Sequence, residues 1–220
     1  MENLNKYVEH TLLKQDASEK DLIKLFEEAK EHKFLGVCVN PCYVKLAKEN
    51  LKNSDVKIVT VIGFPLGANT KEVKVFETKK AIEDGADEID MVINLTKLKD
   101  DDKDFVVNEI RSIKQACGTH NLKVIIETDL LTKEEIVRAC KYSVEGGADL
   151  VKTSTGFVKG GVGAKAEDVK LMYQTVKDAG LQVKASGGIR DKEAAIAMIE
   201  AGVVRLGTSS GIKIVTYMDS

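Results

Sequence analysis

The stretch Asp149-Leu-Val-Lys-Thr-Ser-Thr-Gly156 places a lysine directly after two aliphatic residues and before a small polar turn. Leu150 and Val151 are typical of a strand buried by helices, and Gly156 marks where that strand gives way to a loop. Lys152 is therefore expected near the carboxyl end of a buried strand. A desolvated lysine near other cations loses its proton more easily, and the neutral amine attacks carbonyl carbons. The alternative is a strand-end lysine whose amine reaches solvent.

Outward from this strand, apolar stretches alternate with amphipathic helical segments along the whole chain. We expect strands over 8–12, 35–39, 56–62, 88–93, 123–127, 150–152, 182–185 and 203–206. Helices are expected over 18–33, 43–51, 71–84, 104–116, 133–145, 166–178 and 192–200, with a short last helix from Ser210. Eight alternating units predict an α/β fold, a single (β/α)₈ TIM barrel spanning residues 1–220. An open doubly wound sheet is the alternative, although no GxGxxG follows the first strand.

The amino-acid composition limits the kinds of partner that the chain is expected to bind. Lys and Arg number 33 against 35 Asp and Glu, a formal charge of −2, which gives no electrostatic argument for nucleic acid or membrane partners. The four cysteines form no CxxC pair, and His10 has no second histidine at metal-binding spacing, so we expect no metal site. The polar first residues do not resemble a signal peptide, and no apolar run approaches 18 residues. We therefore expect a reduced, soluble, cytoplasmic protein.

Two further charged residues fall at inward strand positions. Lys184 repeats the pattern of Lys152 one βα unit later, so the two ammonium groups are expected to approach each other, which disfavours protonation of both. Asp90 stands in Glu88-Ile-Asp-Met-Val-Ile93, where period-two alternation directs it into the barrel with Glu88. Asp90 is expected to pair with the lysines and shuttle protons. The alternative is a structural salt bridge.

Glycines and hydroxyl residues follow the last three expected strands. Loops after the seventh and eighth strands of this fold commonly hold phosphate, because glycine lets backbone amides approach an anion. We expect a phosphate site here, although each glycine pair alone indicates only a turn. Cys38 and Thr153 are possible pocket-lining residues, and Glu127 either lines the pocket or caps a loop. The expected phosphate-binding residues are Gly156, Gly187, Gly188, Arg190, Gly207, Ser209 and Ser210.

Around Asp90, Lys152 and Lys184 the sequence resembles the deoxyribose-phosphate aldolases, class I Schiff-base enzymes on a (β/α)₈ barrel. The matching stretches span almost the whole chain in family order. They are Glu9–Lys14, Gly36–Pro41, Val61–Gly67, Ala86–Asn94, Val151–Phe157, Lys184–Arg190 and Arg205–Ser210. The lysine and aspartate motifs are specific, whereas Ser-Gly-Gly-Ile-Arg occurs in many phosphate-binding barrels.

The resemblance implies reversible cleavage of 2-deoxy-D-ribose 5-phosphate to D-glyceraldehyde 3-phosphate and acetaldehyde, in deoxyribonucleotide catabolism. It implies that Lys152 forms the Schiff base, that Lys184 perturbs its pKa, and that Asp90 donates and accepts protons. No cofactor is implied, because the iminium is itself the electron sink. The expected partners are the sugar phosphate, the aldehyde and further copies of the chain in a homodimer or homotetramer.

Three departures from the family pattern leave questions open. Glu9 stands where the family often has Asp, and the loop Val158–Lys165 is longer than usual. Tyr217 lies three residues from the end, so a proton-transfer role for a terminal tyrosine is unsupported. The alternative functions are another class I sugar-phosphate aldolase or transaldolase, or a non-catalytic sugar-phosphate-binding barrel.

Overall fold

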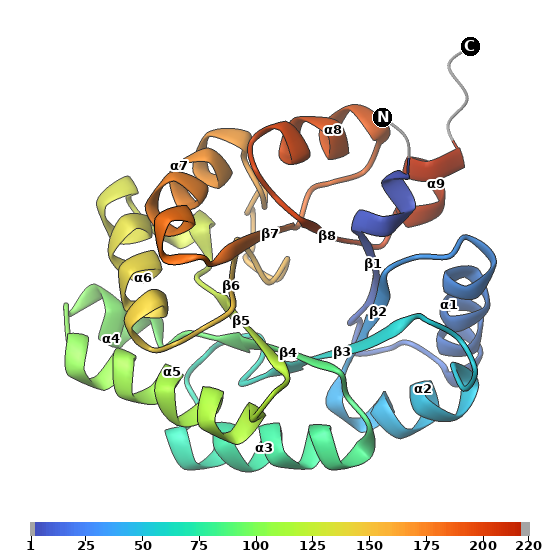
Figure 1. Ribbon diagram of the computed structural model, residues 1–220, viewed down its shortest axis with the longest axis horizontal. Coiled ribbons are helices and arrows are strands. Elements are labelled where there is room, and N and C mark those ends of the chain that lie inside the picture. The colour runs from blue at the N-terminus through green and yellow to red at the C-terminus, as the bar shows by residue number, and fades with distance from the viewer. Residues whose placement is uncertain (1–2, 217–220) are drawn as a thin grey trace.

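Eight parallel strands form a closed barrel in the computed structural model, which describes residues 3–216 (Figure 1). Neighbouring strands follow chain order, and pairing of the last strand with the first closes the ring. The strands are β1 (Val8–Leu12), β2 (Gly36–Val39), β3 (Lys57–Ile62), β4 (Glu88–Val92), β5 (Asn121–Ile125), β6 (Leu150–Lys152), β7 (Gln182–Ser186) and β8 (Arg205–Thr208). The predicted (β/α)₈ barrel is confirmed, and the open doubly wound sheet is excluded.

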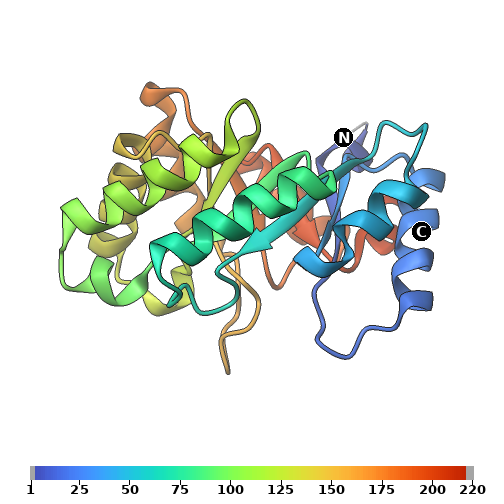
Figure 2. The same ribbon diagram turned by 90° about the horizontal axis from the view of Figure 1, so that it is seen from below.

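Helices cover the outer surface of this barrel (Figure 1). The α-helices are α1 (Glu19–Glu31), α2 (Val44–Asn50), α3 (Lys71–Asp84), α4 (Leu95–Lys99), α5 (Lys103–Cys117), α6 (Lys133–Glu145), α7 (Ala166–Val176), α8 (Lys192–Glu200) and α9 (Gly211–Thr216). Short 3₁₀ turns are η1 (Leu4–Tyr7), η2 (Pro41–Tyr43), η3 (Thr128–Leu130) and η4 (Lys177–Ala179). The connections that follow β1 and β6 project from the same end of the barrel (blue and orange at the bottom of Figure 2).

The helix starts follow from local chemistry. Ser18 caps α1 by accepting a hydrogen bond from the Asp21 amide, and the Asp21 side chain accepts from the Ser18 amide in return. Thr132 and Glu135 make the same reciprocal capping box at α6. Such caps satisfy amides that have no partner within the helix. The buried apolar side of α1, represented by Phe26, then packs on the barrel.

The barrel wall separates two apolar clusters of very different size. Outward-facing strand residues such as Ile89 and Met91 belong to the large cluster shared with the helices. The smaller cluster consists of Leu13, Cys38, Val59 and Val61. The rest of the barrel interior contains buried charged side chains, so apolar packing alone does not fill it.

Two strands are displaced by two residues from the positions expected for them. The last strand is β8 (Arg205–Thr208), not 203–206, because Val203 and Val204 form the approach to it. The fifth strand is β5 (Asn121–Ile125), not 123–127, because Glu127 has a φ of 59° and begins the η3 turn. Left-handed backbone ends a strand. These shifts bring Arg205 and Gly207 into the barrel wall.

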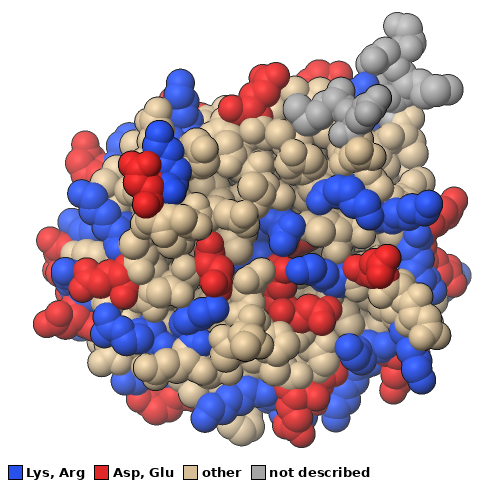
Figure 3. Space-filling view, viewed as in Figure 1, with Lys and Arg blue, Asp and Glu red and all other residues tan. Residues whose placement is uncertain are grey.

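Charges of both signs are interspersed over the face seen in Figure 3. No single-sign patch dominates that face, in keeping with the formal charge of −2. Within residues 3–216, no helix is long and apolar enough to cross a bilayer.

Candidate active site

A cavity of about 480 Å³ opens at the carboxyl ends of the strands. In this fold, that end of the barrel carries the chemistry. Its lining comes from the ends of β1, β6, β7 and β8 and from the segments that follow them. The residues are Thr11, Leu12, Leu13, Lys14, Lys152, Thr155, Gly156, Phe157, Ser186, Gly187, Gly188, Ile189, Arg190, Gly207, Thr208, Ser209 and Ser210.

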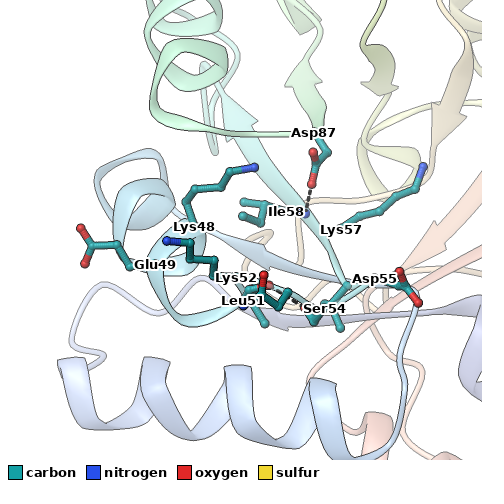
Figure 4. A pocket seen from close by; sticks show the side chains of 11 residues that line it. Lys48, Glu49, Leu51, Lys52, Ser54, Asp55, Lys57, Ile58 and Asp87 are labelled. Atoms are coloured by element: carbon teal, nitrogen blue, oxygen red, sulfur yellow. Dashed lines mark hydrogen bonds between the residues drawn. The ribbon is translucent and has the colours of Figure 1, made fainter.

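Another cavity, of about 590 Å³, lies beside the start of β3 (Figure 4). Its lysines Lys48 and Lys52 are exposed, and the Asp87 carboxylate accepts a backbone hydrogen bond from Ile58 at 2.8 Å. These groups are solvated or already used by the fold. The cavity at the carboxyl ends is therefore the better candidate for an active site.

Lys152 lies at the inner end of the carboxyl-end cavity and is 3% exposed. Its Nζ donates to Asp90 Oδ2 at 2.8 Å, and Lys184 Nζ donates to the same oxygen at 2.7 Å. Lys152 and Lys184 are register partners on β6 and β7, so both side chains point the same way from the sheet. The structure thus brings together the three residues that the sequence singled out.

Lys123 is a fourth member of this group and was missed in the sequence. It is fully buried on β5, where its Nζ donates to Asp90 Oδ1 at 2.9 Å and lies 2.6 Å from Glu88 Oε2. The signal was the alternation Leu122-Lys-Val124, which places both aliphatic side chains outside the barrel and the lysine inside it. Both oxygens of Asp90 are therefore held by cations.

Glu9 on β1 completes the network from the other side. Its carboxylate accepts a hydrogen bond from Lys184 Nζ, and it lies 3.5 Å from both Lys123 Nζ and Arg205 Nε. The buried network thus contains Glu9, Glu88 and Asp90 against Lys123, Lys152, Lys184 and the largely buried Arg205. A further cation, the partly exposed Lys57, donates to Glu88 Oε1 at 2.9 Å from the edge of this network.

The network shifts the proton affinities of its members. Burial alone raises the pKa of Asp90, but attraction to Lys123, Lys152 and Lys184 outweighs burial and holds that pKa well below 3.8. Burial alone lowers the pKa of Lys184, and its attraction to Asp90 and Glu9 reverses this and raises the pKa. Asp90 is therefore ionised and Lys184 protonated near neutral pH.

The residues expected to bind phosphate lie along the same cavity. Gly187 and Gly188 have φ angles of 80° and 75°, and this left-handed turn favours glycine. A Cβ at Gly207 would lie 3.1 Å from Lys184 Cε, so a side chain there would crowd the amine. Arg190 and Ser209 line the cavity and are exposed. The complete expected set found in the lining is Gly156, Gly187, Gly188, Arg190, Gly207, Ser209 and Ser210.

Two weaker candidates, Cys38 and Thr153, make contacts that serve the fold. Cys38 is buried in the small inner cluster, and burial raises the pKa of its thiol to about 11 despite the nearby Lys184. Thr153 Oγ1 donates to the Ser186 carbonyl and accepts from the Ser186 amide, both at 3.0 Å. Neither residue is part of the cavity lining. Tyr217 lies outside the described residues.

Metal coordination has no candidate ligand set in the described part of the chain, residues 3–216. No group of three or more His, Cys, Asp or Glu side chains there is arranged to hold an ion. His10 instead lies 2.8 Å from Glu28 through Nε2 and packs against Phe34.

The barrel has a buried lysine on β6, an aspartate that accepts hydrogen bonds from two lysines, and a cavity at the carboxyl ends of the strands. Together these features are typical of an aldolase barrel. Residues 6–216 match the model of the DeoC/LacD family aldolases, and the chain belongs to that family. The resemblance noted in the sequence is confirmed.

Similar proteins narrow the comparison further. A deoxyribose-phosphate aldolase of Clostridium botulinum (strain Langeland) is 60% identical over 213 residues, covering 96% of this chain and 99% of the relative. The deoxyribose-phosphate aldolase of Brevibacillus brevis is 58% identical over 214 residues, 97% of this chain and 96% of the relative. The solved tetrameric deoxyribose phosphate aldolase from Aeropyrum pernix superposes with a TM-score of 0.87 at 33% identity, covering 96% and 88% of the two chains.

Proposed function

We propose that this aldolase cleaves 2-deoxy-D-ribose 5-phosphate reversibly to D-glyceraldehyde 3-phosphate and acetaldehyde through a Schiff base at Lys152. The observation that carries the proposal is that Lys152 alone among the three buried lysines that contact Asp90 lines the cavity, while sharing one Asp90 oxygen with Lys184. The relatives at 58–60% identity carry the name of this activity.

Access separates Lys152 from the other lysines that contact Asp90. Lys152 lines the cavity, whereas Lys123 and Lys184 do not, so its amine is the one that a substrate carbonyl can reach. Asp90 Oδ2 accepts a hydrogen bond from Lys152 Nζ at 2.8 Å and holds the amine at the cavity. The free amine is the form that attacks a carbonyl.

The reaction then follows the usual logic of an enamine. The neutral Lys152 amine adds to C1 of the open-chain sugar, and loss of water gives the iminium. Deprotonation of the C3 hydroxyl breaks the C2–C3 bond, and the bonding electrons pass into the iminium to form an enamine. Glyceraldehyde 3-phosphate leaves, a proton returns to C2, and hydrolysis of the new iminium frees acetaldehyde and the amine.

Asp90 and Lys184 are the groups placed to move these protons. Asp90 is within hydrogen-bond distance of both amines, so a proton passes between them without crossing solvent. No cofactor enters the proposal, because the iminium accepts the electrons of the broken bond. The phosphate lies at the opposite end of the cavity, at the amides of Gly187 and Gly188 with Arg190 and Ser209.

A coupled assay tests the proposal directly: the chain is given deoxyribose 5-phosphate and release of glyceraldehyde 3-phosphate is followed. Borohydride trapping with acetaldehyde tests the mechanism, and we expect a stable adduct whose mass and peptide map place it on Lys152. A non-catalytic sugar-phosphate-binding barrel gives no adduct. A transaldolase gives none with acetaldehyde but transfers a dihydroxyacetone unit.

We also propose that the chain acts in the cytoplasm as a homo-oligomer. Cys38, Cys117 and Cys140 are buried free thiols, in keeping with a reducing compartment. Val73 and Phe76, three residues apart on α3, are 46% and 71% exposed, and a second copy would cover this apolar side. Light scattering of the wild type and of Phe76→Glu tests this assignment, and an unchanged oligomer in the variant would exclude α3 from the interface.

A further inference from the structure

The longer loop Val158–Lys165 lies directly against the glycines expected to bind phosphate. The Ala164 amide donates to the Gly187 carbonyl at 3.0 Å. A Cβ at Gly163 would lie 2.4 Å from the Gly187 carbonyl carbon, and a Cβ at Gly188 would lie 2.3 Å from the Val162 carbonyl oxygen. The two backbones therefore touch without side chains between them, and the position of one sets the position of the other.

The 3₁₀ turn η3 and Glu127 just before it hold the segment that follows Lys152 at two points. On one side, Glu127 accepts a hydrogen bond from the Thr155 amide at 3.1 Å. On the other side, Asp129 Oδ2 accepts from the Gly163 amide at 2.7 Å. A Cβ at Gly161 would lie 2.7 Å from the same Asp129 oxygen, so the carboxylate fits closely against the loop. Two carboxylates of one turn thus fix the segment that runs from Lys152 to the phosphate side.

Asp129 also borders a smaller cavity of about 400 Å³ beside the phosphate glycines, lined in part by Gly156, Gly187, Gly188 and Arg190. Four of the residues in this lining, Val158, Gly161, Val162 and Gly163, come from the long loop. A carboxylate this near an arriving phosphate repels it, so the presence of Asp129 here calls for a structural task that offsets the repulsion. The hydrogen bond to Gly163 is such a task.

We infer that Asp129 is a positioning residue for phosphate recognition: through Gly163 it fixes the Gly187–Gly188 turn and so determines the preference for phosphorylated substrates. The inference rests on the proposed function. Backbone amides bind an anion well only when their geometry is set beforehand. Loss of the Asp129 hydrogen bond lets the loop and the glycine turn shift, whereas the amine of Lys152 stays held by Asp90 on the barrel strands.

The test compares Asp129→Ala with Asp129→Asn, since asparagine keeps an acceptor oxygen and removes the charge. For Asp129→Ala we expect KM for deoxyribose 5-phosphate to rise about 10-fold, the effect of one lost charge-assisted hydrogen bond. We expect kcat to stay within about 3-fold, and kcat/KM for unphosphorylated 2-deoxyribose to change less than 2-fold. Inorganic phosphate, as the direct probe, should inhibit the variant about 10-fold more weakly.

Asp129→Asn should restore KM to within about 3-fold of the wild type, because the amide oxygen accepts from Gly163. Asp178→Ala, an exposed acid on η4 that lines neither cavity, is the matched control and should leave both substrates unaffected. Gly163→Ala is a second route to the same displacement, and it should reproduce the selective rise in KM.

The outcomes separate the two proposals. A wild-type chain inactive on deoxyribose 5-phosphate overturns the proposed function, and the inference falls with it. If the wild type is active, then equal losses on both substrates, or no rise in KM for Asp129→Ala, overturn the role of Asp129 alone. A KM for Asp129→Asn as high as that of the alanine variant would do the same.

Discussion

Two groups of buried charges lie on opposite sides of the barrel wall, and they differ in balance and in access. Lys74 on α3 and Glu109 on α5 form a one-to-one pair, 2.9 Å apart and fully buried between helices and sheet. Lys74 Nζ also donates to the Val92 carbonyl at 2.9 Å. Inside the barrel, Asp90 holds three lysines, and one of them opens on a cavity.

Burial of charge serves the structure in the Lys74–Glu109 pair and serves the proposed chemistry in the network around Asp90. Burial lowers the pKa of Lys74 and raises that of Glu109, but the sealed pair has no opening, within the described residues, through which a substrate could reach either group, so its role is in helix packing. In the inner network Lys152 shares Asp90 with two other lysines, and its access to the cavity is what distinguishes it as the proposed nucleophile. Burial of a lysine alone would not have distinguished Lys74 from Lys152.

The strongest test of this difference exchanges each lysine for an uncharged residue. Lys152→Ala should lower kcat by at least about 10⁴-fold, because the covalent step is lost. Lys74→Met should keep kcat within about 3-fold in the folded fraction. Coupled assays and circular dichroism of both variants check this, and substantial turnover by folded Lys152→Ala would remove the nucleophile assignment.

Removing a cation beside Lys152 should have a smaller effect. Lys184→Leu removes the cation that shares an Asp90 oxygen with Lys152, so turnover at neutral pH should fall about 10²- to 10³-fold. The acid limb of the pH–rate profile should move to higher pH. An unchanged profile in an active variant would show that the two amines are not coupled.

Lys123→Met tests whether the inner residue acts through Asp90. We expect a fall in kcat of about 10²-fold with KM changed less than about 3-fold, because Lys123 lies away from the cavity and positions the carboxylate. Lys123→Arg should recover part of kcat by restoring a donor to Asp90. A loss confined to KM would contradict the positioning role.

Substitutions in the buried Lys74–Glu109 pair should lower the stability of the fold and leave turnover intact. Glu109→Gln leaves the buried Lys74 without its anion, and we expect a loss of about 3–5 kcal/mol in the free energy of unfolding. The double variant Lys74→Met, Glu109→Leu should recover most of that loss, since an apolar pair needs no charge balance. Urea unfolding measures both, and additive losses in the double variant would argue against a coupled pair.

Acid should weaken the inner network through Glu88. Burial raises the pKa of this carboxyl, but attraction to Lys123 and hydrogen bonds from Lys123 and Lys57 outweigh burial and lower the pKa to about 2, from 4.5. The resulting stability is fully present above 4.5 and is lost as pH falls toward 2. Glu88→Gln should therefore show a shallower loss of stability between pH 5 and 2, by roughly one proton in the linkage slope. Denaturant unfolding at several pH values measures that slope.

Sequence reasoning succeeded where the two-residue alternation of a strand decided which way a side chain points. Alternation placed Asp90 inside the barrel, and the repeat of an aliphatic residue followed by lysine placed Lys152 and Lys184 on neighbouring strands. The inward position of Lys123 was not predicted, because Lys123 stands at the start of an apolar run. The same alternation nevertheless directs its side chain into the barrel. Lys74 could not be found, because its burial depends on how α3 packs on α5, and lysines on helices usually reach solvent.

The contacts of Asp129 were beyond sequence reasoning for a similar reason. The long loop Val158–Lys165 was visible as a departure, but its partner comes from another βα connection, 34 residues away from Gly163. Hydrogen bonds between loops depend on the fold that brings the loops together. The sequence allows Glu127 either to line the pocket or to cap a loop. In the structure its carboxylate accepts a hydrogen bond from the Thr155 amide and so anchors a loop.

Closure of the ring by β1 and β8 has a consequence for how the chain matures. Glu9 meets Lys184 across 175 residues, and Asp90 meets Lys123, Lys152 and Lys184 from four different strands. A nascent chain cannot complete this network before β7 has been synthesised, because Lys184 is on that strand. Products that end before β7 lack a group of the proposed site, and we expect them to be inactive.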